Sequence, residues 1–418
     1  MISVPPHLGS GLSQTAPLSL LTVSTLFPNP VQTTHGVFVE TRLRKLLASG
    51  EVTARVLAPI PWVPSFVDNS SLGPVHRVPR HVIRNGIEID HPRYLVVPKV
   101  GMSLTPFTLY RTIRRSLKLL LDTGHRIDLI DAHYFYPDGV AAVWAAKEFN
   151  LPVVVTSRGT DLNLIPQFRI PRGMIQRAAA AADGLITVCA ALKDSLVELG
   201  VPQNRVTVLR NGVDLDRFRP IDRAEARKFL GLTRPTLASV GHLVERKGHH
   251  HVISALARLP GMDLIIAGDG PERSALEQLA AQLGVSERVT FAGAVDQDRL
   301  RLIYNAVDAL VLASSREGWA NVLLESMACG TPVVASAVWG TPEVVASPEA
   351  GVLMGSLDAA GVGEGVERLF SALPRRTDTR LYAEGFDWDS TTQGQLTLFR
   401  EILGRKGVHE REAAGAKG

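Results

Sequence analysis

The sequence has few cysteines, few aromatic residues and no long apolar run. Its two cysteines among 418 residues, Cys189 and Cys329, lie among small or apolar neighbours, so we expect buried thiols and not a disulfide framework. Aromatic residues make up 6% of the chain, which disfavours a stacking platform for single-stranded nucleic acid. The sequence contains no run of about eighteen apolar residues, so we expect no membrane-spanning helix. The start lacks the features of a secretory signal, so we expect a cytoplasmic protein.

The remaining composition is that of an ordinary globular protein, with 45% hydrophobic and 21% charged residues. A formal net charge of +4 is mildly basic and suits an anionic substrate or an anionic membrane surface. Nucleic acid is disfavoured, because no nucleic-acid-binding motif is present. A chain of this length is expected to form two domains.

Short apolar strand patterns alternate with longer helical patterns along the whole chain. The expected strands are Leu18–Val23, Val52–Leu57, Ile127–His133, Pro152–Ser157, Leu185–Cys189, Val206–Leu209, Thr236–Val240, Leu264–Ala267, Val289–Ala292, Ala309–Leu312, Pro332–Ala335 and Val352–Met354. This alternation predicts an α/β fold with two doubly wound, Rossmann-like domains.

A turn-rich segment, Asn211–Pro220, marks the expected hinge between a domain of residues 1–210 and a domain of residues 211–385. The proline-rich segment Trp62–Met102 departs from the alternation, and we expect an irregular insertion there. A helical pattern follows at the C-terminal end, and residues 406–418 are expected to form a frayed tail.

The strongest chemical signal is the segment Ser314–Ser336, SSREGWANVLLESMACGTPVVAS. Glu317 and Glu325 are eight positions apart, which on a helix spans about 12 Å, a suitable reach for a folded nucleotide sugar. One carboxylate would bind sugar hydroxyls and the other the ribose diol. Free backbone N–H groups at the helix start would bind sugar and diphosphate oxygens; they belong to Gly318, Trp319, Ala320, Asn321 and Val322. Two glutamates alone would equally suit an exposed surface, but the flanking residues argue against chance.

A second signal is the segment Ala238–Leu256, ASVGHLVERKGHHHVISAL. A strand ends at Gly241, and a basic loop with Arg246 and Lys247 provides cations for a diphosphate. The alternative is a solvated basic turn before a helix. Three consecutive histidines, His249–His251, face different sides of a helix, so we expect no metal site there.

Further glycines end other strands of the second domain. Gly268 and Gly293 belong at the carboxyl ends of parallel strands, where open α/β sheets bind ligands. Both would also suit turn geometry alone.

Taken together, these segments resemble the family-four retaining glycosyltransferases of GT-B fold. The resemblance is close from about Gly184 to Val345, through LITVCAALKDSLVELG, VTVLRNGVDLDRFRP, VGHLVERKG, IAGDGPERSAL and EGWANVLLESMACGTPVVAS. The first half is similar more loosely, through GVFVETRLRKL, DAHYFYPDGVAA and VTSRGTDLN. The mix resembles members that build extracellular polysaccharides. It implies two domains facing each other across a cleft, with the C-terminal helix of residues 386–405 packing back on the first.

The resemblance also implies roles for individual residues. Glu317 would contact the transferred sugar, Glu325 the ribose and Lys247 the diphosphate, with Gly36 under the phosphates. The residues implied on the sugar and acceptor side are His133, Arg158, Gly159, Thr160 and Asp161.

The sequence departs from the family at three of these positions. His242 stands where an arginine is common, and Arg246 would compensate for it. Thr160 stands where many relatives have a histidine. Gly36 is alone where paired glycines are usual.

For the mechanism we expect no metal and no cofactor. Lys247, Arg246 and helix N-termini would stabilise the leaving nucleotide diphosphate in place of a divalent cation. The pair Asp214 and Asp216 lies in the hinge and is an alternative metal motif. A double displacement with a carboxylate nucleophile is one alternative, and Asp161 is its candidate nucleophile. The resemblance favours reaction on one face, with the leaving phosphate accepting the proton.

The expected donor is a UDP-sugar or a GDP-sugar, and the expected acceptor a glycan or a polyprenyl-linked sugar. A nucleotide-sugar epimerase and a non-catalytic partner subunit are the alternatives. The segment Leu109–Leu121 is an amphipathic helix with Arg111, Arg114, Arg115 and Lys118. It suits peripheral contact with an anionic membrane and equally suits ordinary packing on the sheet.

Overall fold

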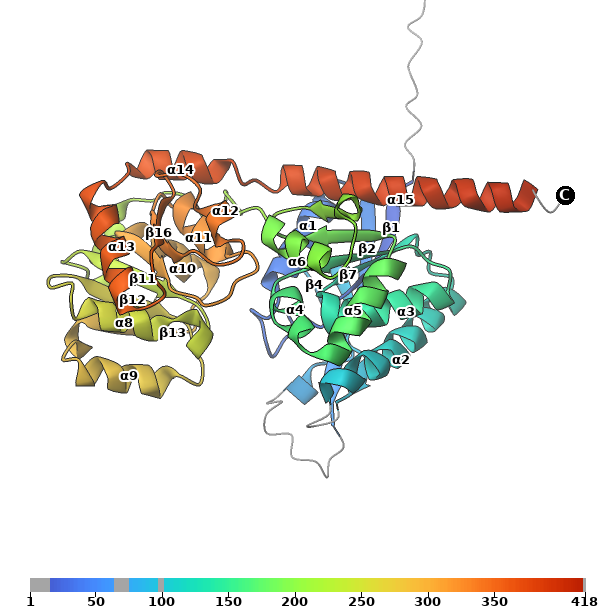
Figure 1. Cartoon of the computed structure of the whole chain (residues 1–418), viewed down its shortest axis with the longest axis horizontal. Helices are drawn as coiled ribbons and strands as arrows, with labels where there is room; N and C mark the ends of the chain where they lie inside the picture. The colour runs from blue at the N-terminus through green and yellow to red at the C-terminus, as the bar shows by residue number, and fades with distance from the viewer. Residues whose placement is uncertain (1–15, 64–74, 97–100, 416–418) are drawn as a thin grey trace, which may run out of the picture.

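The computed structural model describes residues 16–63, 75–96 and 101–415, of which residues 407–415 are described by backbone alone. In these residues the chain forms two α/β domains that lie side by side, with one long helix across the top of the first (Figure 1). The first domain is built on an eight-stranded sheet and the second on a six-stranded sheet. The predicted α/β class with two doubly wound domains is confirmed.

The sheet of the first domain has the order β10-β9-β8-β7-β1-β2-β5-β4. Its strands are β1 (Leu18–Val23), β2 (Val52–Leu57), β4 (His81–Arg84), β5 (Ile87–Asp90), β7 (Leu129–His133), β8 (Val153–Ser157), β9 (Gly184–Thr187) and β10 (Val206–Val208). Its helices are α1 (Val37–Ala48), α2 (Gly101–Asp122), α3 (Val140–Glu148), α4 (Thr160–Asn163), α5 (Arg169–Ala181) and α6 (Ala190–Glu198). Neighbouring strands are parallel except β4 and β5.

The sheet of the second domain is parallel throughout and has the order β13-β12-β11-β14-β15-β16. Its strands are β11 (Thr236–Val240), β12 (Asp263–Ala267), β13 (Val289–Gly293), β14 (Ala309–Leu312), β15 (Val333–Ser336) and β16 (Gly351–Met354). Its helices are α7 (Arg223–Leu230), α8 (His249–Leu256), α9 (Arg273–Gln282), α10 (Gln297–Ala306), α11 (Asn321–Ala328), α12 (Thr341–Val344), α13 (Ala359–Ser371) and α14 (Arg376–Glu384).

The prediction of an irregular insertion over Trp62–Met102 is wrong in part. Two short strands, β3 (Ile60–Trp62) and β6 (Arg93–Leu95), pair with each other, and β5 pairs with β2 to extend the main sheet. Ile87 and Ile89 are nearly fully buried and alternate with exposed neighbours, which is the pattern of a half-buried strand. Residues 64–74 and 97–100 of that segment lie outside the described residues.

The last helix, α15 (Asp389–Gly415), belongs to the first domain although it follows the second in sequence (Figure 1). Leu396, Phe399 and Ile402 recur every three residues, so they lie on one face, and this face packs with Val154 and Ile186 of the first sheet. The backbone is helical to Gly415, so the frayed tail expected from residue 406 is wrong for the described part of that segment. Its residues, such as glutamate, arginine and alanine, are good helix formers.

Both cysteines are buried and unpaired, as expected. Among the described residues, no helix is long and apolar enough to cross a membrane.

Replacement of Phe399 by alanine should destabilise the first domain by about 3–5 kcal/mol, because a fully buried aromatic ring is lost from the contact between α15 and the sheet. Urea denaturation followed by circular dichroism measures this change. The exposed Glu401, also on α15, gives the control variant Glu401→Ala, which should unfold like the wild type. Equal stability of the two variants would contradict the packing of α15.

Candidate active site

Three backbone turns meet at the carboxyl edge of the second sheet. Gly241 follows β11, Gly268 follows β12, and Gly293 ends β13. The N–H of Gly241 donates to Ala267, and the N–H of Gly268 donates to Gly293. A Cβ on Gly268 would lie 1.8 Å from the carbonyl oxygen of Gly241, so only glycine allows these turns to stack so closely. Backbone atoms of these three turns therefore line the carboxyl edge of the sheet, next to the basic loop that contains Arg246 and Lys247.

Lys247 and Glu317, predicted from separate segments, are brought together by the fold. Lys247 ends a short 3₁₀ turn before α8, and Glu317 lies in the loop between β14 and α11. Lys247 Nζ lies 2.5 Å from Glu317 Oε1, and the two side chains are only 16% and 10% exposed. His242 and Arg246 lie on the same loop as Lys247 and are exposed. This ion pair places a cation and a carboxylate at one edge of the sheet, as a diphosphate-sugar site requires.

The start of α11 lies beside this ion pair, with Ala320 as its N-cap. The side chain of Trp319 does not point into solvent: it is 6% exposed, and its indole N–H donates to the carbonyl of Asn211 at 3.0 Å. Asn321 and Val322 begin the helix and are partly exposed, so their backbone lies where a ligand can reach it.

Glu325 lies one turn further along α11, next to Tyr304 of α10. The Tyr304 hydroxyl donates to Glu325 Oε2 at 3.1 Å. Burial raises the pKa of Glu325 to about 7, and the hydrogen bond from Tyr304 lowers it by less. The carboxylate can therefore change charge near neutral pH.

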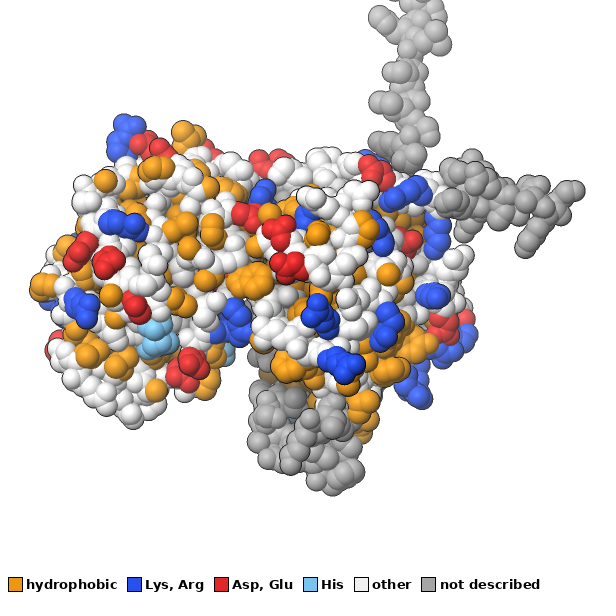
Figure 2. All heavy atoms as spheres, in the orientation of Figure 1, with side chains coloured by type: hydrophobic (Ala, Val, Ile, Leu, Met, Phe, Trp, Pro, Cys, Tyr) orange, Lys and Arg blue, Asp and Glu red, His pale blue; other side chains and the backbone are white. Residues whose placement is uncertain are grey.

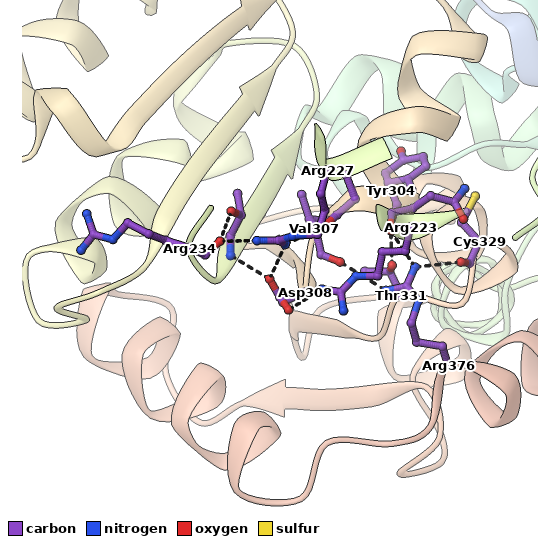
Figure 3. Close-up of polar contacts among 12 residues, drawn as sticks. Arg223, Arg227, Arg234, Tyr304, Val307, Asp308, Cys329, Thr331 and Arg376 are labelled. Atoms are coloured by element: carbon purple, nitrogen blue, oxygen red, sulfur yellow. Dashed lines mark hydrogen bonds and ion pairs between the residues drawn. The ribbon is translucent and has the colours of Figure 1, made fainter. Parts of the chain in front are cut away.

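Side chains of other segments stabilise the position of Tyr304 by donating hydrogen bonds to backbone carbonyls around it (Figure 3). The Thr331 hydroxyl donates to the carbonyl of Tyr304, and the Arg376 guanidinium donates to the carbonyls of Val307 and Cys329. These contacts join the ends of α10 and α11, so they set the distance between Tyr304 and Glu325. No local sequence pattern predicts these contacts, because the residues that make them are far apart in the chain.

The residues implied on the acceptor side form a buried polar chain instead of an open pocket. His133 Nε2 lies 3.0 Å from Asp131, and Arg158 lies 2.5 Å from His133 Nδ1 and 3.1 Å from Asn211. Burial lowers the pKa of His133 to about 4, more than Asp131 raises it, so the imidazole is neutral. His133 and Arg158 are 1% and 8% exposed, and their place on the acceptor side stays a prediction.

Asp161, the candidate nucleophile of a double displacement, is held by the loop after β8. Asp161 is fully buried, and its two oxygens accept hydrogen bonds from the backbone N–H groups of Phe135, Arg158 and Gly159. Burial raises the pKa of Asp161, and these N–H groups oppose that shift. Its contacts hold the loop after β8 in shape. Thr160, the residue before Asp161, begins α4.

The two domains touch at the candidate site. A Cβ on Gly318 would lie 1.9 Å from the carbonyl oxygen of Arg158, and the Asn163 amide lies 3.4 Å from the carbonyl oxygen of Glu317. Tyr134, which the sequence did not single out, also lies at this boundary. It has a left-handed φ of 78°, a hydrogen bond to Thr160, and the cation of Arg246 as an electrostatic neighbour. The positive φ of Tyr134, just after a strand, marks it as a candidate functional residue, and this feature can be seen only in a structure.

The remaining predicted residues have local roles. Gly36 caps α1 with its backbone against Leu26. Asp214 accepts the N–H of Arg217 in the hinge, which accounts for one half of the alternative metal motif. Among the described residues, no three histidine, cysteine or acidic side chains are grouped to hold a metal ion.

Comparison with known proteins matches both halves of this architecture. Residues 222–385 match the model for glycosyl transferases group 1, and residues 76–217 match the model for glycosyltransferase family 4. The chain is 35% identical over 316 residues to the D-inositol 3-phosphate glycosyltransferase of Mycolicibacterium smegmatis, a match that covers 70% of this chain and 71% of the relative. The chain belongs to the family-four glycosyltransferases. The predicted family is confirmed at this level.

Other relatives show how far the likeness of this glycosyltransferase reaches. The D-inositol 3-phosphate glycosyltransferase of Mycobacterium marinum is 33% identical over 310 residues, which cover 68% of this chain and 65% of that protein, slightly less than two thirds of its length. Sucrose-phosphate synthase from Thermosynechococcus elongatus shares the fold with a TM-score of 0.70 and 20% identity, over 96% of this chain and 100% of the other. Anabaena HepE, solved with UDP, gives a TM-score of 0.69 at 18% identity, over 92% and 100%. These structures establish the GT-B fold alone.

The raised pKa of Glu325 predicts a pH-dependent stability. From pH 5 to about pH 7 the folded protein keeps a proton on this carboxyl that the unfolded chain has lost, so the free energy of unfolding falls as pH rises through this range. Glutamine does not titrate, so the free energy of unfolding of Glu325→Gln should not fall in this way. Between pH 5 and pH 8, the free energy of unfolding of this variant should rise by about 2 kcal/mol relative to that of the wild type. Urea denaturation at the two pH values measures the difference.

The matched control is Glu367→Gln, which changes an exposed glutamate on α13. It should follow the wild type at both pH values. A gain of the same size in both variants would show that burial of Glu325 is not its cause.

Proposed function

We propose that the protein is a retaining, metal-independent glycosyltransferase that moves a sugar from a UDP-sugar or GDP-sugar to a lipid-linked glycan acceptor in surface polysaccharide synthesis. The observation that carries the donor part is the Lys247–Glu317 pair at the start of α11, with Glu325 one turn behind it. Lys247 would bind the diphosphate, Glu317 the sugar hydroxyls and Glu325 the ribose. On binding, Lys247 would exchange the glutamate for phosphate oxygens.

The proposal of metal independence is supported by the charges around the expected diphosphate. Lys247, the exposed Arg246 and the start of α11 supply positive charge at one edge of the sheet. Such preorganised charge stabilises a leaving diphosphate as a bound cation would. His242 lies on the same loop and would add a hydrogen-bond donor there.

For the retaining course, we propose that the acceptor attacks from the face that the diphosphate leaves and passes its proton to the departing phosphate. This is supported by the surroundings of Asp161, whose oxygens are already held by backbone N–H groups. A double displacement would need a carboxylate free to reach the sugar. A sugar adduct trapped on Asp161 would contradict this proposal.

A lipid-linked acceptor is supported by the outer surface of the first domain. Figure 2 shows apolar side chains gathered along its lower edge with Lys and Arg beside them. The large exposed apolar side chains of α2 and of the α4–α5 region are Met102, Leu104, Phe107, Leu119, Phe168 and Ile170. The inner face of α2, with Leu109 and Ile113, is buried in the core. The helix thus packs on the domain and still turns its basic face outward, which suits the inner face of an anionic membrane.

The relatives favour a second candidate acceptor, a small phosphorylated polyol. The Mycolicibacterium smegmatis relative is named for D-inositol 3-phosphate and is 35% identical to this chain. A nucleotide-sugar epimerase or a non-catalytic subunit would share the fold, and the first would release an altered sugar without any acceptor. Release of a glycosylated product from inositol phosphate, with none from lipid-linked glycans, would favour the polyol.

The donor site is tested by the affinity for UDP and GDP, measured by calorimetry with EDTA present. We expect the wild type to bind one of the two, and Lys247→Ala to weaken that binding by about tenfold to a hundredfold, because a charge-assisted contact to phosphate is lost. The matched control is Arg375→Ala, an exposed cation before α14 in the same domain. Binding that requires a metal, or that survives in Lys247→Ala unchanged, would contradict the proposed donor site.

Membrane contact is tested by sedimentation with phosphatidylglycerol vesicles. Change of Arg111, Arg114, Arg115 and Lys118 to glutamine should abolish most of the binding, since each cation near an anionic surface contributes about 1 kcal/mol. Two of the four are paired, Arg114 with Glu148 and Lys118 with Asp122, and should contribute less.

The matched control changes four exposed cations of the second domain to glutamine: Lys228, Arg258, Arg299 and Arg375. It should bind vesicles like the wild type. Vesicle binding that is the same in both quadruple variants would contradict the membrane surface on α2.

A further inference from the structure

One carboxylate of the second domain holds two parts of the first. Glu343, in α12, accepts hydrogen bonds from the guanidinium of Arg210 at 2.9 and 2.6 Å. It also accepts the backbone N–H groups of Ala190 and Ala191, which begin α6, at 2.7 and 3.3 Å. Arg210 lies just after β10, at the start of the segment that joins the domains. Ala190 and Ala191 belong to the first domain, and Arg210 follows its last strand. The contacts of Glu343 with them therefore exist only while the two domains are together.

The next residue, Asn211, reaches the candidate site itself. Its carbonyl oxygen accepts the indole N–H of Trp319 at 3.0 Å, and its amide lies 3.3 Å from Asn321. On its other side it accepts a hydrogen bond from Arg158 at 3.1 Å. The guanidinium of Arg210 lies 5.9 Å from the Trp319 ring. The two joining residues therefore contact both ends of the segment that follows Glu317.

We propose that Glu343, Arg210 and Asn211 form an interdomain clasp that positions Trp319, and through it the Glu317 loop, for sugar transfer. These are positioning residues, because none of them is placed to touch the donor. The inference rests on the proposed function, since it assigns the clasp to the same donor loop. Closure of the domains makes the Glu343 contacts, and these contacts fix Trp319 against Asn211. The loop that carries Glu317 is thus ordered only in the closed arrangement.

The test is the variant Glu343→Gln, which removes the charge opposite Arg210 but keeps an oxygen that can accept the N–H groups of α6. With UDP or GDP bound, amide hydrogen exchange over residues 318–321 should rise about tenfold, while exchange in β12 stays at the wild-type rate. The release of nucleotide from UDP-glucose or GDP-mannose should slow about tenfold. The affinity for the free nucleotide should fall less than the rate of release, because Lys247 and Glu325 belong to the second domain alone and keep their contacts.

Two further variants make the result specific. Arg210→Lys keeps the positive charge and should lose less than Arg210→Ala. The double variant Glu343→Gln/Arg210→Ala should be no worse than its poorer single variant, because both act on one contact. The matched control is Glu277→Gln, which removes a charge opposite Arg273 in an exposed pair on α9 and should match the wild type.

Wild-type exchange over residues 318–321 in Glu343→Gln would overturn the clasp, and so would a uniform rise across the second domain. A loss of nucleotide affinity equal to the loss of turnover would overturn it as well. If the wild type binds neither UDP nor GDP, the proposed function fails, and the same exchange comparison on the free protein decides the clasp separately.

Discussion

The close contact between the backbone of Arg158 and Gly159 and that of Gly318 is the constraint on which the rest of the site depends. A side chain on Gly318 would collide with the Arg158 carbonyl, so only glycine lets the domains meet there. Asp161 fixes one partner by binding the N–H groups of its loop, and Lys247 fixes the other through Glu317. Because Glu317 stands at this boundary, the chemistry proposed for it needs both domains in place.

Buried charge in the first domain serves the same boundary. Arg42 and Arg158 share the carboxylate of Asp131 as an electrostatic partner, and Arg158 has Asp161 as a second. The neutral His133 lies between Asp131 and Arg158. Gln395 of α15 joins this group through hydrogen bonds to Asp131 and from Arg42. Buried ions need such partners, because an unpaired charge there is strongly destabilising. The C-terminal helix is thus tied to Asn211 and to the contact between the domains.

Strand positions could be predicted from the sequence because buried parallel strands are continuous apolar runs, and β1, β2, β11 and β14 have the expected bounds. The short strands around Ile87 and Ile89 were not predicted, because a few alternating apolar residues among prolines and arginines give a weak strand pattern. The proximity of Lys247 and Glu317 could be predicted in general terms, because both residues follow the carboxyl ends of neighbouring strands. The orientations of His133, Arg158 and Asp161 were not, because a motif fixes a position in the chain and not the direction of a side chain.

The difference between the two halves of the site has a physical cause. On the donor side, the groups come from turns of one sheet, and each turn is encoded by neighbouring residues such as Gly268 or Lys247. On the other side, the position of Trp319 depends on Asn211, which depends on Arg158 and on whether Glu343 has met Arg210. Such a chain crosses both domains and has no local pattern in the sequence. It follows that residues which set turnover can lie far from the motifs that identify the family.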